Sequence, residues 1–291
     1  MASLIFGASS PVGQSLYDRL VSTDDIVYVS SRRRPEFIEE ELFLQVDLHS
    51  ENFSAYLNSL KHMLAGQRLR IFFCSHIWLT LGALDALIKD EELSHNIASV
   101  IVLSSASYQT KTYSISREER RYASKLRDSH RSISTLLTKS KIPHFIVAPT
   151  VILGQSASYS DKLSRAYSWL SLVAWILVMP TDRGLRQPIA PSQLADLLYS
   201  LASSEFILPT ERGNLASVGG DEVVSIDRLL LARVPRKPII TIHVPSRLWL
   251  FASSLVAIIA PQFGAILHRM PIDLLPDYGL TSFRKQMGNA P

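Results

Sequence analysis

The segment from Gly7 to Gly13 has the residue types and spacing of a phosphate-binding turn. It consists of Gly7-Ala8-Ser9-Ser10-Pro11-Val12-Gly13, a Gly-x-x-Gly-x-x-Gly pattern in which serine replaces the middle glycine. A turn of this kind at the start of a helix directs free N–H groups and the positive end of the helix dipole at an anion, commonly a dinucleotide pyrophosphate. The cofactor-binding residues that the turn predicts are Gly7, Ser9, Ser10, Pro11, Val12 and Gly13.

The sequence on both sides of this turn supplies the elements that would hold it. The apolar run 4–6 predicts a buried strand, and apolar residues at 12, 16 and 20 predict a helix whose inner face packs on the sheet. Pro11 suits the first helical turn, where its missing N–H costs nothing. The alternative is a strand-turn-helix unit that binds no ligand.

Three consecutive arginines follow the second predicted strand, residues 26–29. In a dinucleotide fold the end of this strand faces the adenosine ribose. An acidic residue there binds the 2′-hydroxyl of NAD, whereas arginine accommodates the 2′-phosphate of NADP. Arg32 and Arg33 stand at this position with Arg34 beside them and no acidic residue, which predicts NADP(H) in preference to NAD(H). The alternative is a solvated basic turn.

Polar residues also follow other predicted strands. Asp47 and Leu48 come after the third, and Asp47 is expected to accept a hydrogen bond from the adenine amino group. The alternative for Asp47 is a helix N-cap or turn residue. Ser75 and Pro149 stand at the ends of the fourth and sixth predicted strands and are assigned to cofactor binding as well.

Strands alternate with helix-length segments over the first half of the chain. The predicted strands are 4–6, 26–29, 42–46, 69–74, 100–103 and 144–147. This rhythm predicts an α/β protein with a doubly wound, Rossmann-type parallel sheet. We predict an NAD(P)-binding domain over 1–150 and a smaller substrate-binding lobe over 151–291, completing one compact unit. The elements expected in the lobe are helices over 167–179 and 192–202, strands over 215–218 and 239–244, and a helical region from about 247.

The composition excludes several classes of function. The chain has 291 residues, 47% of them hydrophobic and 19% charged, with a formal net charge of +4. Apart from the three arginines its basic residues are scattered, so nucleic-acid binding is not expected. The single cysteine, Cys74, and the lack of a signal-peptide pattern predict a cytoplasmic protein without an internal disulfide. Metal-ligand spacings, the Gly-x-Ser-x-Gly motif and a lysine-bearing phosphate loop are absent from the sequence, so no metal is predicted.

Residues 248–267 raise the question of membrane contact. They contain no charged side chain, and their length approaches the roughly 20 residues that span a bilayer. Pro261 lies within the run and is expected to break or kink a helix. The segment therefore predicts a buried or surface-packed helical pair, with peripheral membrane contact as the alternative.

Further motifs extend the pattern along the chain. In order they are Asp47-Leu48, Leu103-Ser104-Ser105, Pro149-Thr150 with Gly154 after it, Leu185-Arg186-Gln187-Pro188-Ile189, Ala195-Asp196-Leu197, Val218-Gly219-Gly220-Asp221-Glu222 and His268-Arg269-Met270. Together with the turn at Gly7, this order resembles the extended short-chain dehydrogenases/reductases. More narrowly, it is similar to the NAD(P)-dependent sugar-nucleotide epimerases, dehydratases and 4-keto reductases. The resemblance spans nearly the whole chain.

The resemblance implies catalytic roles for four residues. In the family a tyrosine hydroxyl donates a proton to the carbonyl, a lysine lowers its pKa, and a serine positions the carbonyl. Carried over, Ser105 is the polar contact and Tyr122 the leading proton donor, while Lys111 or Lys125 is the cation. The alternatives are a strand-end cap for Ser105 and a packing role for Tyr122.

The resemblance also implies contacts with a nucleotide-sugar substrate. Arg186 is expected to contact the substrate diphosphate, unless it is a surface arginine. Tyr108 is expected to bind substrate, and both Tyr108 and Tyr113 compete with Tyr122 for the proton-donor role. Dimers are common among such proteins, and the sequence leaves dimerisation open.

The chain departs from the family at its most diagnostic motif. Family members usually carry Tyr-x-x-x-Lys after the fifth strand, whereas here Lys125 follows Tyr122 at i+3 and Leu126 takes i+4. These two positions differ by about 100° around a helix. We therefore expect an atypical NADP(H)-dependent 4-keto reductase or epimerase of a nucleotide-linked sugar. The alternative is a catalytically inactive nucleotide-binding scaffold or sensor on the same fold.

Overall fold

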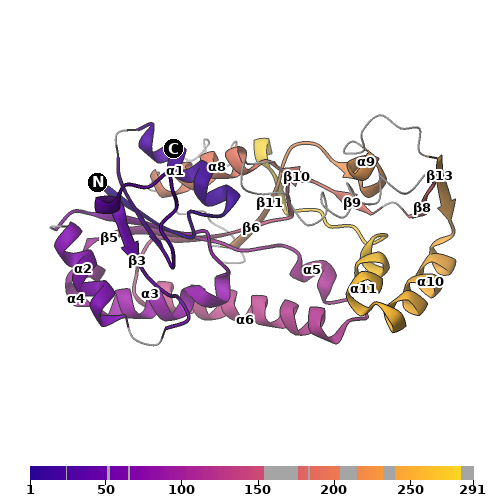
Figure 1. The fold of residues 1–291 in the computed structure, drawn as a ribbon, viewed down its shortest axis with the longest axis horizontal. Helices are drawn as coiled ribbons and strands as arrows, with labels where there is room; N and C mark the ends of the chain where they lie inside the picture. The colour runs from indigo at the N-terminus through magenta and orange to yellow at the C-terminus, as the bar shows by residue number, and fades with distance from the viewer. Residues whose placement is uncertain are drawn as a thin grey trace.

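The computed structural model describes residues 1–23, 25–50, 53–64, 66–153, 176–182, 184–203, 215–231 and 240–282. At its centre is an eight-stranded parallel sheet in the order β14-β11-β6-β5-β4-β1-β2-β3 (Figure 1). Its strands are β1 (Ala2–Phe6), β2 (Ile26–Ser31), β3 (Phe43–Gln45), β4 (Leu69–Phe73), β5 (Ile97–Leu103), β6 (His144–Pro149), β11 (Leu215–Gly219) and β14 (Tyr278–Gly279). The predicted Rossmann-type doubly wound fold is confirmed.

Helices cover both faces of this sheet (Figure 1). One layer contains α1 (Pro11–Val21) and α8 (Pro191–Ser203), and the other contains α2 (Ser54–Leu64), α3 (Thr80–Lys89), α4 (Glu91–Asn96) and the long α6 (Arg117–Lys139). Adjacent residues of β1 serve different layers, since Ile5 packs in the α1–α8 core and Phe6 in the opposite one. Burial on both faces explains why these strands are continuous apolar runs.

The direction of winding reverses between β1 and β4. Strands β2 and β3 follow on one side of β1, and β4, β5 and β6 follow on the other. In open α/β sheets, ligands bind in the crevice at such a switch point. Gly7 turns the chain there with a φ of +81°, and a Cβ on it would lie 3.0 Å from the backbone of Cys74 and Ser75. The turn is thus pressed against the end of β4, where the left-handed conformation and the close approach both require glycine.

Residues beyond 150 extend the sheet and also build the far end of the molecule. Strands β11 and β14 join the main sheet, while β8 (Ile176–Pro180) pairs in parallel with β13 (Ile240–Val244) next to the helices α10 (Ser246–Ile259) and α11 (Pro261–Arg269). The smaller elements are η1 (Glu40–Leu42), η2 (Ile77–Leu79), α5 (Tyr108–Lys111), β7 (Val151–Ile152), β9 (Leu185–Arg186), β10 (Pro188–Ile189), β12 (Val224–Ser225) and α9 (Ile226–Leu231). Because the chain returns to the sheet after residue 150, the domain boundary there remains a prediction.

One expected element is corrected. The prediction of a helix over 167–179 is wrong at its end, because Ile176–Pro180 forms β8, which pairs with β13. Residues 167–175 lie outside the described residues, as does Gly154 of the predicted motifs. A short apolar run fits a strand as well as a buried helix, and only the pairing partner distinguishes them. The predicted helical pair within 248–267 is confirmed, with α11 beginning at Pro261. None of the helices in the described ranges is long and apolar enough to cross a membrane.

Candidate functional site

A cleft of about 1120 Å³ opens at the carboxyl ends of the central strands. Its walls come from the turn after β1, the segments after β2, β3, β4 and β5, and the side of α6. Most of the predicted cofactor residues line it, namely Gly7, Ser9, Ser10, Pro11, Val12, Arg32, Arg33, Asp47, Leu48 and Ser75. Ser105 and Tyr122 line the same cleft. The fold therefore gathers residues from these six separate stretches of sequence into one space.

The glycine turn is built around a capped helix. The Ser10 hydroxyl accepts a hydrogen bond from the Gly13 N–H over 3.1 Å and so caps α1. Gly13 itself lies behind the turn and does not line the cleft; a Cβ on it would lie 2.4 Å from the Gly7 carbonyl oxygen. Gly13 thus lets the helix approach the turn. The serine at the middle position uses one of the N–H groups that a bound anion could otherwise contact.

The arginine segment presents exposed guanidinium groups beside the cleft. Side chains hold its backbone, since Gln45 Nε2 donates to the Arg32 carbonyl over 3.3 Å and Ser31 Oγ donates to the Arg33 carbonyl over 2.5 Å. Arg34 lies 3.5 Å from Glu40 in an exposed pair, and such pairs contribute little to stability. The segment is therefore a solvated basic turn that also borders the cleft, so neither of the two predicted roles is excluded.

The residues after β3 and β4 bear on whether a dinucleotide fits. Asp47 Oδ1 accepts a hydrogen bond from the His49 N–H over 3.0 Å, which confirms the alternative role of a turn residue; its adenine contact remains a prediction. Ser75 lines the cleft beside the Gly7 turn, and in the described part of the chain its buried hydroxyl has no hydrogen-bond partner. An unsatisfied buried hydroxyl costs about 1–3 kcal/mol, which a polar ligand in the cleft would recover. The site therefore suits a ligand with hydrogen-bonding groups at this point.

Tyr122 enters the cleft from α6 within an aromatic and cationic cluster. The ring of Trp78 meets it edge-on with centroids 5.1 Å apart, and Lys111 Nζ lies 3.7 Å from its ring centroid. Lys125 Nζ lies 5.0 Å from the ring of Trp78 instead. Neither lysine lines the cleft, although the fold brings both to the same aromatic pair. Burial raises the pKa of the Tyr122 hydroxyl, so the group is protonated at neutral pH.

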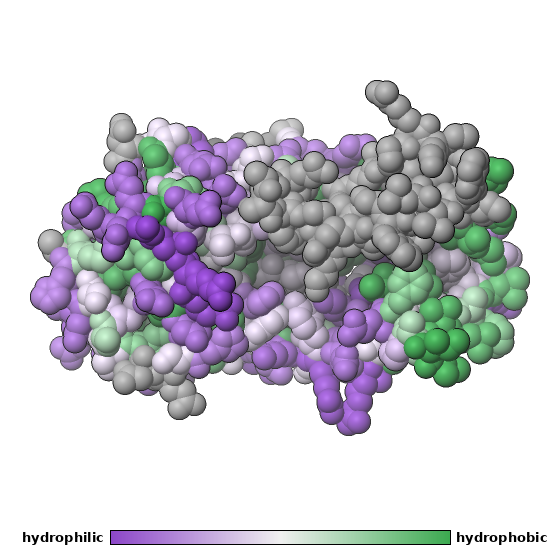
Figure 2. All heavy atoms as spheres, in the orientation of Figure 1, coloured by the Kyte–Doolittle hydropathy of each residue, from purple (hydrophilic) through white to green (hydrophobic). Residues whose placement is uncertain are grey.

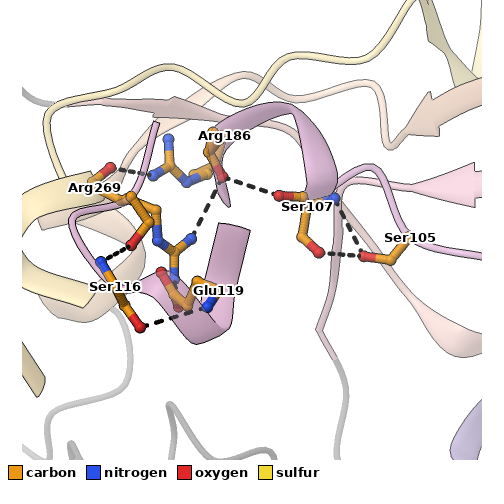
Figure 3. Close-up of polar contacts among 8 residues, drawn as sticks. Ser105, Ser107, Ser116, Glu119, Arg186 and Arg269 are labelled. Carbon is orange, nitrogen blue, oxygen red and sulfur yellow. Dashed lines mark hydrogen bonds and ion pairs between the residues drawn. The ribbon is translucent and has the colours of Figure 1, made fainter. Parts of the chain in front are cut away.

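Ser105 forms a small hydrogen-bonded turn. Its hydroxyl donates to Ser107 Oγ over 2.9 Å and accepts from the Ser107 N–H over 3.2 Å (Figure 3). The alternative role of a strand-end cap is therefore confirmed for Ser105. Its position in the cleft wall leaves the carbonyl-positioning role as a proposal.

Ser104 and His130 form a pair that the sequence analysis did not predict. Ser104 lines the cleft at the end of β5, and its hydroxyl is hydrogen-bonded to Nε2 of the buried His130 on α6. The ring of Tyr108 meets His130 edge-on with centroids 5.4 Å apart, so Tyr108 lies behind the cleft wall and not in it. His130 falls in the buried stripe 126, 130, 133 and 137 of α6, a spacing typical of core residues. Only the residue type, a histidine in an apolar stripe, could have indicated the pair.

The environment of His130 predicts a pH-dependent stability. Burial lowers its pKa to about 4 from the usual 6.5, so below pH 6.5 the unfolded chain binds a proton that the folded protein does not. The free energy of unfolding is therefore expected to fall by about 3 kcal/mol between pH 7 and pH 4 through this group. Urea unfolding at several pH values checks this. His130→Gln is expected to remove that part of the slope and exposed His62→Gln to retain it; equal slopes in both variants would contradict the assignment.

Arg186 lies in the second half of the chain, outside the cleft lining. Its guanidinium donates to the carbonyls of Leu185 over 2.8 Å and Ile272 over 2.6 Å, and to that of Arg269 over 3.4 Å. Figure 3 shows the contact with Arg269. It is 8% exposed, so the alternative of a surface arginine is wrong, and burial lowers its pKa to about 10. Arg269 in turn pairs with Glu119 over 2.5 Å. These contacts tie β9 to the chain after α11 and to α6, while the diphosphate contact stays a prediction.

The structure also bears on the predicted cofactor contact of Pro149 and on metal binding. Pro149 is buried at the end of β6 and does not line the cleft; its carbonyl accepts a hydrogen bond from the Ala106 N–H over 2.9 Å. It thus shapes the turn that carries Ser105. Within the described ranges, no group of three or more His, Cys, Asp or Glu side chains could hold a metal ion.

The sheet order, the glycine turn at the switch point and the cleft above it define a Rossmann-type α/β protein with a ligand-sized crevice. No family model and no curated protein matches the sequence. Solved structures do match. MoeE5 in complex with UDP-glucose and NAD is 15% identical, with a TM-score of 0.56 over 84% of this chain and 85% of that one.

Two other solved structures extend the comparison. UDP-N-acetylglucosamine 4-epimerase from Bacillus cereus is 10% identical, with a TM-score of 0.61 over 84% of this chain and 85% of its own. The protein gox2253 is 14% identical, with a TM-score of 0.67 over 100% of this chain and 93% of its own. The chain therefore has the fold found in NAD-dependent sugar-nucleotide epimerases, and the predicted resemblance is confirmed at the level of the fold.

Proposed function

We propose that this protein is an NADP(H)-dependent oxidoreductase that reduces, or epimerises through, the C4 ketone of a nucleotide-linked sugar. The observation that carries the proposal is the shared cleft, in which the glycine turn, the arginine segment, Ser105 and Tyr122 meet at the switch point of the sheet. The proteins of similar fold support the substrate class, since MoeE5 was solved with UDP-glucose and NAD and another is named as a UDP-N-acetylglucosamine 4-epimerase.

Residues from four strand ends would hold the cofactor. The turn from Ser9 to Val12 would bind the pyrophosphate at the start of α1, with the Ser75 hydroxyl as a further donor beside it. Arg32 and Arg33 would bind the 2′-phosphate, and Asp47 with Leu48 would border the adenine. The bound cofactor supplies the hydride.

The remaining chemistry is a proton transfer and the orientation of the carbonyl. Tyr122 would donate the proton to the carbonyl oxygen, because its raised pKa keeps the hydroxyl protonated at neutral pH. Ser105 would position the same oxygen.

The lysine geometry favours a second candidate function. Lys111 lies over the ring face of Tyr122 and Lys125 over Trp78, so neither matches the Tyr-x-x-x-Lys arrangement. A protein that binds the dinucleotide as a scaffold or sensor would need no such lysine. Turnover of a 4-keto-6-deoxy sugar nucleotide with NADPH would exclude this alternative, whereas cofactor binding without turnover would favour it.

The cofactor preference has a direct test. We expect the wild-type protein to bind NADPH more tightly than NADH in calorimetric titrations. The Arg32→Ala/Arg33→Ala double variant is expected to lose about 10²–10⁴-fold in NADPH affinity, because each of the two charge-assisted hydrogen bonds to the phosphate contributes about 1.5–3 kcal/mol. Its NADH affinity is expected to stay the same.

Arg68→Ala is the matched control. Arg68 is exposed at the start of β4, at the opposite edge of the sheet, so its loss is expected to leave both affinities unchanged. Equal affinity of the wild-type protein for the two cofactors would overturn the NADP assignment. Failure to bind either cofactor would overturn the proposed function.

A further inference from the structure

Helices α10 and α11 form a tightly packed hairpin at the far end of the molecule (Figure 1). A Cβ on Gly264 would lie 2.4 Å from Cα of Ala257, so the two helices are in backbone contact there. Trp249 is buried between them, and its Nε1 donates to the Leu267 carbonyl over 2.8 Å. Contacts between the two helices thus occupy the inner side of the hairpin, and this packing sets the shape of the hairpin.

The outer side of the hairpin is apolar as well. Figure 2 shows hydrophobic side chains gathered at the end of the molecule where Figure 1 places α10 and α11. The exposed apolar residues are Leu248, Phe251, Leu255, Ile258 and Ile259 on α10 and Phe263 and Ile266 on α11. They recur at intervals of three and four and so share one helix face. We call these seven residues the hairpin patch. A contiguous group of exposed apolar side chains on a protein surface marks an interaction site.

Exposure is greatest at the tip of the hairpin. Ile258 and Ile259 are 77% and 88% exposed, and the turn continues through Ala260 and Pro261 without a charged residue. Connections between helices are normally polar because water surrounds them. A protruding apolar tip contacts little of a flat protein partner, but a lipid surface can enclose it.

The two helices of the hairpin contain no acidic residue. From residue 240 to residue 272 the chain contains two arginines and two histidines and no aspartate or glutamate. Arg247 and His243 are exposed at the base of α10. Next to the tip, a groove of about 850 Å³ is bordered by the first turn of α6, where Arg117 and Glu118 offset one another. Arg269 is paired with Glu119, so Arg247 is the exposed cation behind the apolar tip; this arrangement complements an anionic membrane surface.

We propose that the hairpin patch docks on the surface of an anionic lipid bilayer. Helix α10 has 14 residues and a length of roughly 21 Å, less than the ~30 Å of the hydrocarbon core. The hairpin enters one leaflet with its tip while Arg247 stays at the headgroups. The hairpin patch shares no residue with the lining of the cofactor cleft, so docking can be tested separately from cofactor binding.

Flotation of the purified full chain with vesicles tests the proposal. The protein is expected to float with vesicles of phosphatidylcholine and phosphatidylserine in equal parts, and more weakly with phosphatidylcholine alone. Ile258→Glu/Ile259→Glu is expected to lower the partition coefficient at least about a hundredfold, since two buried isoleucines are lost. Arg247→Gln is expected to lower it about fivefold on the anionic vesicles only.

Val21→Glu is the matched control, because Val21 is an exposed apolar residue at the end of α1, away from the hairpin. It is expected to float like the wild-type protein. As a second measurement, an environment-sensitive dye on Gln262→Cys is expected to shift to the blue on adding vesicles; the native Cys74 is buried and does not compete for the dye. Both measurements need no cofactor, so they are separate from the test of the proposed function.

Two results would overturn the proposal. One is wild-type protein that stays at the bottom of the gradient with both vesicle types. The other is flotation that the double glutamate variant retains while circular dichroism shows it to be folded. If the wild-type protein does not float and sedimentation shows a dimer that the double variant abolishes, the hairpin patch is an interface between copies and the lipid proposal is wrong.

Discussion

Tyr122→Phe is expected to lower kcat for reduction of a 4-keto sugar nucleotide by about 10²–10⁴-fold, the usual contribution of a positioned general acid. Tyr122 lines the cleft, and the substitution removes its hydroxyl but keeps the ring against Trp78 and Lys111. The dissociation constant of NADPH is therefore expected to change little. Steady-state kinetics and cofactor titration measure the two effects separately.

Tyr113→Phe provides the control, since Tyr113 is exposed and does not line the cleft. Its kcat is expected to equal that of the wild-type enzyme. If Tyr122→Phe also retains full activity, another group supplies the proton. Tyr108 would be the next residue to test, because its ring lies against His130 behind Ser104.

Gly13→Ala is expected to destabilise the protein by about 1–3 kcal/mol and to abolish NADPH binding. The added methyl group would lie 2.4 Å from the Gly7 carbonyl oxygen and 2.8 Å from Cα of Ala8. Both contacts are with backbone, so the turn itself must move to relieve them. Urea unfolding and calorimetric titration of the cofactor measure the two expected losses.

Gly82→Ala is the comparison for Gly13→Ala. Gly82 is an exposed residue of α3, and a Cβ on it would meet only the Phe53 ring at 3.6 Å. Because alanine is the better helix former, this variant is expected to gain up to about 1 kcal/mol in stability with NADPH affinity unchanged. Normal cofactor binding by a folded Gly13→Ala variant would show that the turn does not form the phosphate site.

Much of the fold and of the cleft could be predicted because the patterns behind them are local. An apolar run such as Leu4–Phe6 indicates a strand from its own residues, and a glycine after it indicates a turn. Parallel strands end at one edge of a sheet, so residues that follow them gather there without any knowledge of their contacts. For this reason the arginine segment, Asp47, Ser75 and Ser105 line a single cleft.

Side-chain environments could not be predicted in this way. The roles of Lys111 and Lys125 depend on Trp78, which lies more than 30 residues earlier in the chain. The burial of Arg186 depends on carbonyls of residues 269 and 272, and periodicity alone contains no information about such partners. The strand β8 cannot be distinguished from the end of a helix by its own residues, because its partner β13 lies about 60 residues later.

The succession of strands along the chain, the glycine turn, the arginines beside it and the helical hairpin could be predicted, since each depends on neighbouring residues and on backbone preferences. That His130 lies behind Ser104, and that the hairpin keeps its apolar face in contact with solvent, became known only from the fold. The physical reason is that hydrogen-bond partners and burial are properties of segments distant in sequence. Packing in three dimensions brings those segments together and fixes which groups remain available for a ligand.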